Sequence, residues 1–135
     1  MTFAGMNYLA IVAATAAGFV FGGIWYNVLS KPWMAALGRT EAEMKANGMI
    51  VPMIVTVIAQ LVMAWVLAGL IGHMGPVTVR TGVISGAFCW LGFVATTLAV
   101  NHAFQGAKRS LTLIDGAHWL GVLLIQGAVI GLFRV

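Results

Sequence analysis

A chain of 135 residues that is 61% hydrophobic and only 7% charged is not a soluble globular domain, because such domains carry about 25% charged residues. The seven Lys and Arg residues, which give a formal net charge of +4, are scattered between apolar segments. They form no patch of the kind that binds nucleic acid. The single cysteine, Cys89, excludes a disulfide within the chain and any CxxC site. Composition therefore predicts an integral membrane protein in a lipid bilayer, without a nucleic-acid partner.

Four apolar runs are long enough, or nearly so, to cross a membrane, because about 20 apolar residues in a helix span about 30 Å of hydrocarbon. We expect spans at about residues 7–29, 50–72, 81–101 and 113–133. The first run has no basic segment before it and is too long for a cleaved signal peptide. We therefore expect it to remain in the mature protein. The predicted fold class is all-α: residues 1–135 form a single domain, an integral membrane four-helix bundle.

The basic residues predict the orientation. Five lie in the loops after the first and third spans, and two lie on the opposite side: Lys31, Arg39, Lys45, Lys108 and Arg109 against Arg80 and Arg134. Loops rich in Lys and Arg face the cytoplasm, which places both termini on the outer face. The margin of five to two leaves an inverted or dual topology as the alternative.

The first loop has helix signals of its own. Ser30 precedes Pro32 and a segment that ends near Gly38, which predicts a capped short helix. Thr40 and Glu43 have the spacing of a capping box, with an end near Gly48. We therefore expect a short helix within residues 31–48 that lies on the cytoplasmic surface of the bilayer.

Small residues four apart occur in every predicted span and favour close helix packing: Ala14, Gly18 and Gly22; Ala64, Ala68 and Gly72; Gly82 and Gly86; Gly127 and Gly131. We expect some of these ridges to serve the bundle and one to remain for a homo-oligomer. Gln60 and Gln126 lie deeper in their spans and are expected to bridge helices.

Six polar residues are predicted to lie near the cytoplasmic surface and are the candidate site, which we call the polar layer: Tyr26, Asn27, Asn101, His102, Asp115 and His118. Polar groups at membrane depth face the interior or water, and mark functional sites. Three interpretations stay open. Asp115 caps the fourth helix within a structural network; the layer lines the mouth of a transport path; or His102, Asp115 and His118 bind a divalent metal.

Enzyme signatures such as a P-loop, GxSxG or HExxH do not occur in the sequence. No acidic residue lies in the middle of a predicted span, so a proton-coupled exporter with a buried Glu in its first helix is not supported. We expect no enzymatic activity and no cofactor.

Paired blocks along the chain carry a resemblance to a known family. They are Asn7-Tyr8, Gly23-Ile24-Trp25-Tyr26, Lys31-Pro32-Trp33-Met34, Ala36-Leu37-Gly38, Trp90-Leu91-Gly92-Phe93, then Asn101, Phe104, Gly106 and Lys108, and finally Ile114-Asp115-Gly116 with His118. The chain resembles the small bacterial membrane proteins called domain of unknown function 1761. The family favours Arg where this chain has Lys108, and an aromatic residue where it has Ala117. The resemblance implies a bundle of four membrane helices. It does not point to any particular activity, because the family is uncharacterised.

Two functions follow from these observations. The first is a structural or accessory component of a bacterial inner membrane, which packs with itself or with a larger membrane complex. The second is a small oligomeric channel or transporter with the polar layer at its cytoplasmic mouth. A membrane enzyme or metal-handling protein that uses the same residues is a third and weaker alternative.

Overall fold

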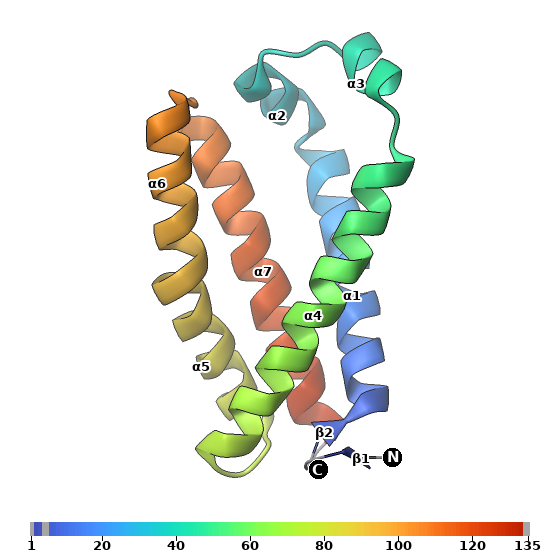
Figure 1. Cartoon of the computed structure of the whole chain (residues 1–135), viewed down its shortest axis with the longest axis vertical. Helices are drawn as coiled ribbons and strands as arrows, with labels where there is room; N and C mark the ends of the chain where they lie inside the picture. The colour runs from blue at the N-terminus through green and yellow to red at the C-terminus, as the bar shows by residue number, and fades with distance from the viewer. Residues whose placement is uncertain (1, 4–5, 134–135) are drawn as a thin grey trace.

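The computed structural model describes residues 2–3 and 6–133, and it confirms the all-α fold class (Figure 1). Its four spans are α1 (Tyr8–Val28), α4 (Ile50–Met74), a third span and α7 (Arg109–Phe133). The third span joins α5 (Val79–Cys89), a π-helical segment η1 (Trp90–Ala95) and α6 (Thr96–Gln105). Each span is long and apolar enough to cross a membrane. The chain is therefore a multi-pass membrane protein.

The remaining elements are short. Helices α2 (Ser30–Leu37) and α3 (Glu41–Asn47) connect α1 with α4, and strands β1 (Thr2–Phe3) and β2 (Met6–Asn7) form an antiparallel pair before α1. We call the end of the molecule that carries α2, α3 and the turn between α6 and α7 the loop end. Helix α1 begins and α7 ends at the opposite end (Figure 1). Arg80 lies there too, whereas Arg134 lies outside the described residues.

Local signals explain most of the helix ends. The Asn7 side chain accepts a hydrogen bond from the Ala10 amide (3.2 Å), and Thr40 accepts one from the Glu43 amide (3.2 Å). Gly38 ends α2 in the left-handed region that suits glycine (φ 71°). The predicted cap at Ser30 is wrong, because Ser30 lies inside α2 and Leu29 occupies the cap position without a side-chain bond.

The turn between the third and fourth spans is shorter than predicted. Helix α6 continues to Gln105, and α7 already begins at Arg109. Gly106 closes α6 in the left-handed region (φ 66°). Polar residues near these ends suggested that both helices were shorter, but a helix continues into the headgroup region as long as its backbone groups stay hydrogen-bonded.

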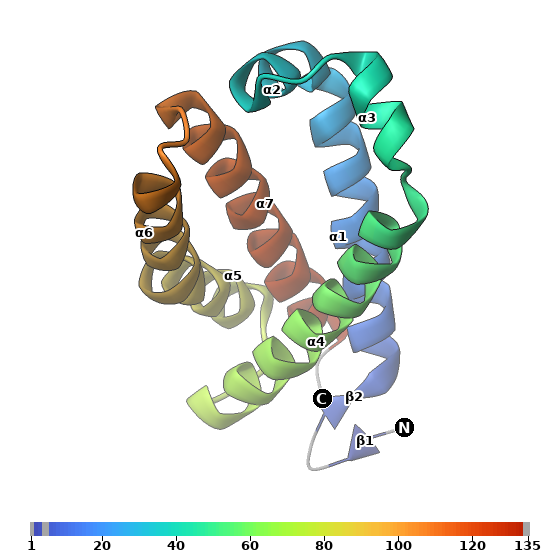
Figure 2. The ribbon, with the colours of Figure 1, turned by 45° about the horizontal axis from the view of Figure 1, so that its top comes forward.

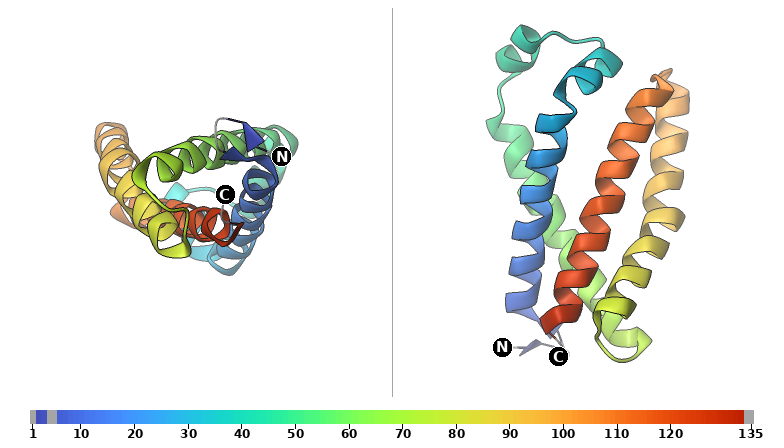
Figure 3. Two further views of the ribbon diagram at one scale, coloured as in Figure 1. Left: turned by 90° about the horizontal axis from the view of Figure 1, so that it is seen from below. Right: turned by 180° about the vertical axis from the view of Figure 1, so that it is seen from behind.

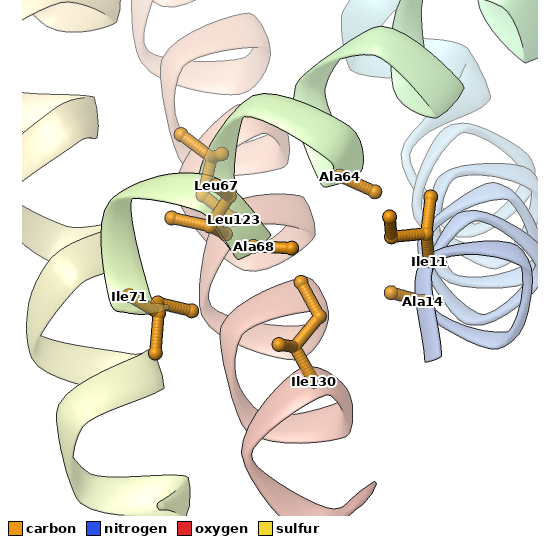
Figure 4. Close-up of a cluster of buried hydrophobic side chains, with 8 residues drawn as sticks. All are labelled: Ile11, Ala14, Ala64, Leu67, Ala68, Ile71, Leu123 and Ile130. Atoms are coloured by element: carbon orange, nitrogen blue, oxygen red, sulfur yellow. The ribbon is translucent and has the colours of Figure 1, made fainter. Parts of the chain in front are cut away.

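The spans pack unevenly around α7. Viewed from behind, α7 lies between α1 and the third span, and α4 crosses them at an angle (Figure 3). The buried apolar cluster lies where α1, α4 and α7 meet (Figure 4): Ile11, Ala14, Ala64, Leu67, Ala68, Ile71, Leu123 and Ile130. Three of its members are alanine, which lets the helices approach closely.

Small residues bring α5 directly onto the backbone of α7. A Cβ atom on Gly82 would overlap the Gly127 carbonyl, and one on Gly127 would overlap the Gly82 carbonyl. A Cβ on Gly86 would lie 2.5 Å from the Leu123 carbonyl oxygen. Of the glycines in the predicted ridges, only Gly72 could take a Cβ that meets no described atom of another residue within 4 Å. All the other ridge glycines thus have close contacts within the chain, and a ridge that serves a homo-oligomer stays a prediction.

The third span is the most peripheral of the four. Only 11% of its most apolar stretch is buried, against 44% for α7. It contacts α7 along one side, while α4 and α6 diverge toward the loop end (Figure 2). The third span therefore leaves most of its surface to the membrane.

Candidate functional site

The centre of the candidate site is a hydrogen bond between two helices. Tyr26 lies near the end of α1 and Asp115 in the second turn of α7, and the Tyr26 hydroxyl donates to Asp115 Oδ1 at 2.7 Å. These helices run antiparallel, so the end of one lies beside the start of the other. The interpretation of Asp115 as a helix cap is wrong, because α7 begins six residues earlier at Arg109.

His118 lies one turn deeper on the same face of α7. It is buried and surrounded by aromatic rings, with centroids of Phe21, Tyr26 and Trp119 at 6.1, 4.7 and 4.5 Å. Gly22 makes room for the ring, since a Cβ there would lie 2.8 Å from His118 Nε2. No hydrogen-bond partner for Nδ1 lies among the described residues. Tyr26, Asp115 and His118 thus form one cluster, which we call the α1–α7 cluster.

Helix α2 covers the α1–α7 cluster at the loop end. The Trp33 ring packs on Tyr26 with a centroid distance of 4.8 Å. The Lys108 ammonium donates to the Ala35 carbonyl at 3.4 Å, which ties the turn after α6 to α2. The short helix predicted for the first loop therefore serves as a cover over the cluster.

Two tryptophans hold α7 from opposite sides. Trp25 of α1 donates its indole N–H to the Ile114 carbonyl (3.1 Å), and Trp90 of η1 donates to the Gly116 carbonyl (2.8 Å). Both bonds flank Asp115 along α7. They fix the rotation of α7 between α1 and the third span, and with it the direction in which Asp115 points.

The other three residues of the polar layer lie apart from the cluster. His102 Nδ1 and the Thr112 hydroxyl share a hydrogen bond of 2.8 Å between α6 and α7. Asn101 is exposed and lines a hollow beside Trp119, and Asn27 is exposed at the end of α1. The six residues do not form one site. Across residues 2–3 and 6–133, no group of three His, Cys, Asp or Glu could hold a metal ion, so the structure gives no support to the metal alternative.

The two buried glutamines lie deeper. Gln126 Nε2 donates to the Gln60 backbone carbonyl at 3.1 Å, so Gln126 bridges α7 and α4 as predicted. Gln60 is fully buried, but both polar atoms of its side chain, like Gln126 Oε1, have no partner in the described part of the chain. Both side chains converge on Gly18 of α1, where a Cβ would lie 2.6 Å from Gln60 Oε1 and 3.5 Å from Gln126 Nε2.

Sequence reasoning missed several residues of this region. Phe21, Gly22 and Trp119 surround His118, and η1 replaces part of an expected α-helix. The sequence contained a signal for Gly22, since this residue belongs to the small-residue ridge and lies one turn before Tyr26. It contained no signal for the π-helical segment, because the apolar sequence there fits an α-helix equally well.

Comparison with known proteins identifies the family of the chain. A family model described as protein of unknown function (DUF1761) matches residues 9–131, which include all four spans except Tyr8, Leu132 and Phe133, and all six residues of the polar layer. No curated protein and no solved structure matches the chain. The match extends over nearly the whole sequence, and the chain therefore belongs to the DUF1761 family of proteins of unknown function.

Proposed function

We propose that this protein is a non-enzymatic structural or accessory component of a bacterial inner membrane, and that its loop end faces the cytoplasm. It acts by packing through the outer face of the third span, with itself or with a larger membrane complex. The observation that carries the proposal is the low burial of this span, 11% against 44% for α7. Large exposed side chains of this span include Phe88, Leu91 and Phe104, of which Phe104 is 91% exposed, whereas the exposed Phe93 lines a hollow beside α4.

Apolar exposure alone has little meaning in lipid, because the acyl chains are as apolar as leucine. The third span differs from the others in its attachment. It is held to α7 by glycine contacts in α5, by the Trp90 bond and by the His102–Thr112 bond, all on one side. Its opposite side, with large aromatic residues, remains available to another helix. A non-enzymatic role fits the α1–α7 cluster, where Tyr26 and Asp115 hold two helices together.

Photo-crosslinking in the native membrane tests this proposal. A benzophenone amino acid is placed at Phe88 or Phe104, and at Ile58 of α4 as the control, which is 57% exposed. We expect a discrete adduct from the third span and none from Ile58. An adduct that joins two differently tagged copies indicates self-packing, and a larger adduct of fixed mass indicates a complex. Equal adducts from both faces, or none, would refute packing through this face.

A second function, a small oligomeric channel or transporter, is favoured by one further observation. Asp115, His118 and Gln126 lie on one stripe of α7, and buried polar atoms of His118, Gln126 and Gln60 along it have no hydrogen-bond partner among the described residues. Val122 interrupts the stripe, because it is fully buried and lies close to Gly18. A path for ions or protons would need this valine to move.

Proton entry into liposomes that contain the purified protein and a trapped pH dye tests the second function. The channel hypothesis expects Asp115→Asn to abolish the flux and Val122→Ala to raise it, with folding checked by circular dichroism. Identical flux in all three proteins would exclude the polar stripe as the proton path. Loss of folded protein in Asp115→Asn would instead support the structural role of the Tyr26 bond.

A further inference from the structure

Two adjoining hollows lie between α4 and the third span. One has a volume of about 290 Å³ and the other about 300 Å³, and both are lined by Met63 of α4 and Val94 of η1. Most of their lining residues belong to residues 59–70 of α4 and residues 89–101 of the third span, and these two spans diverge toward the loop end (Figure 2). Because the hollows share Met63 and Val94, we describe them as one groove between two membrane spans. These volumes lie at the lower end of the range for ligand pockets, which is roughly 300–1,000 Å³.

The chemistry of the groove changes along its length. The deeper hollow is lined by apolar side chains such as Val62, Val66 and Leu70. The hollow nearer the loop end is lined in part by polar ones: Thr97, Asn101 and Trp119. The Thr97 hydroxyl donates to the Phe93 carbonyl, but the Asn101 amide and the Trp119 indole N–H make no hydrogen bond within residues 6–133. Two side chains that carry N–H donors, Asn101 and Trp119, therefore line one end of a groove that is otherwise mostly apolar.

The loop end is also the basic end of the molecule. It carries Lys31, Arg39, Lys45, Lys108 and Arg109 against Glu41 and Glu43, and Lys45 is paired with Glu41 at 3.2 Å. Basic residues between or beside membrane helices attract anionic lipid headgroups. Charge, hydrogen-bond donors and apolar walls thus follow one another from the loop end into the membrane, in the order of the parts of a phospholipid.

We propose that this groove binds one anionic glycerophospholipid from the leaflet at the loop end. One acyl chain lies along Val62, Val66 and Val94, the ester and phosphate oxygens accept hydrogen bonds from Asn101 and Trp119, and the basic loops neutralise the headgroup. The π-helical turn η1 forms part of the wall, and such turns occur frequently at functional sites. The proposal is independent of packing through Phe88 and Phe104.

The shape of the groove favours a lipid chain over a helix of a second copy. Met63 and Val94 line both hollows, so an occupant of the whole groove has to pass these two side chains. A helix with its side chains is about 10 Å across or more. An acyl chain is narrow and flexible, so it follows the groove without separating α4 from the third span.

Native mass spectrometry of the purified full-length chain tests the lipid site. The protein in detergent is titrated with phosphatidylglycerol, and with phosphatidylcholine of the same acyl chains. We expect one phosphatidylglycerol per chain, held about ten-fold more tightly than phosphatidylcholine, which corresponds to about 1.4 kcal/mol. Ala59 lines the groove, so Ala59→Trp should lower retention about ten-fold. Ala99→Trp, the same change at an exposed position of α6, should leave retention unchanged.

Asn101→Leu is the second variant, because it removes a donor without filling the groove. It should weaken phosphatidylglycerol binding several-fold while helix content stays the same, which keeps the test valid if Ala59→Trp does not fold. Equal retention of both lipids, or equal retention by Ala59→Trp and Ala99→Trp, would overturn the site and leave only lipid at the general surface. A dimer that carries no lipid and dissociates in Ala59→Trp would assign the groove to a second copy.

Discussion

The contact between α5 and α7 gives the sharpest stability prediction. Gly86→Ala adds a methyl group 2.5 Å from the Leu123 carbonyl oxygen, whereas ordinary contacts of a Cβ begin at about 3.4 Å. The obstacle is backbone, so no side chain can rotate away, and α5 must move from α7. This movement also loosens the neighbouring contact of Gly82 with Gly127.

Overpacking of this kind costs about 1–3 kcal/mol, which lowers the ratio of folded to unfolded protein roughly 5- to 150-fold. The assay is reversible unfolding in mixed micelles, followed by circular dichroism as the fraction of denaturing detergent rises. Gly92→Ala in the same span is the control, because a Cβ there meets nothing within 4 Å. Equal unfolding midpoints for the two variants would refute the reasoning that backbone contact sets the position of α5.

Three further predictions use the same unfolding assay or a labelling experiment. Tyr26→Phe deletes the donor to Asp115 and should cost about 1–2 kcal/mol; an unchanged midpoint would show that the bond adds nothing. Gln60→Leu should be neutral or stabilising, because neither polar atom of that side chain has a partner in the described chain, whereas Gln126→Leu loses a bond worth about 0.6 kcal/mol. A clearly lower unfolding midpoint for Gln60→Leu would contradict the expectation for that variant. In a Cys89→Ser background, His73→Cys should react in intact cells with a reagent that does not cross membranes, and Ala42→Cys only after permeabilisation; the reverse pattern would invert the topology.

The sequence determined the spans because crossing a membrane is a local requirement. A run of about 20 apolar residues has one stable solution in lipid, a helix with all its backbone bonds satisfied internally. The same holds for single residues with local effects. Gly38 and Gly48 end helices, and Thr40 caps one, because their partners lie within a few residues. The four spans, the end of α2 and both ends of α3 were therefore predictable, whereas the start of α2 was not, because Leu29 and not Ser30 occupies the cap position.

Only the tertiary structure decided which polar residues meet. Tyr26 and Asp115 are 89 positions apart, and their bond depends on how α1 and α7 are rotated against each other. That rotation follows from contacts at Gly22 and from the Trp25 and Trp90 bonds, which no periodicity in one segment reveals. The same contacts separate Asn101 and Asn27 from the α1–α7 cluster. Hydrophobicity places a residue at a depth in the membrane, but packing between helices decides its neighbours at that depth.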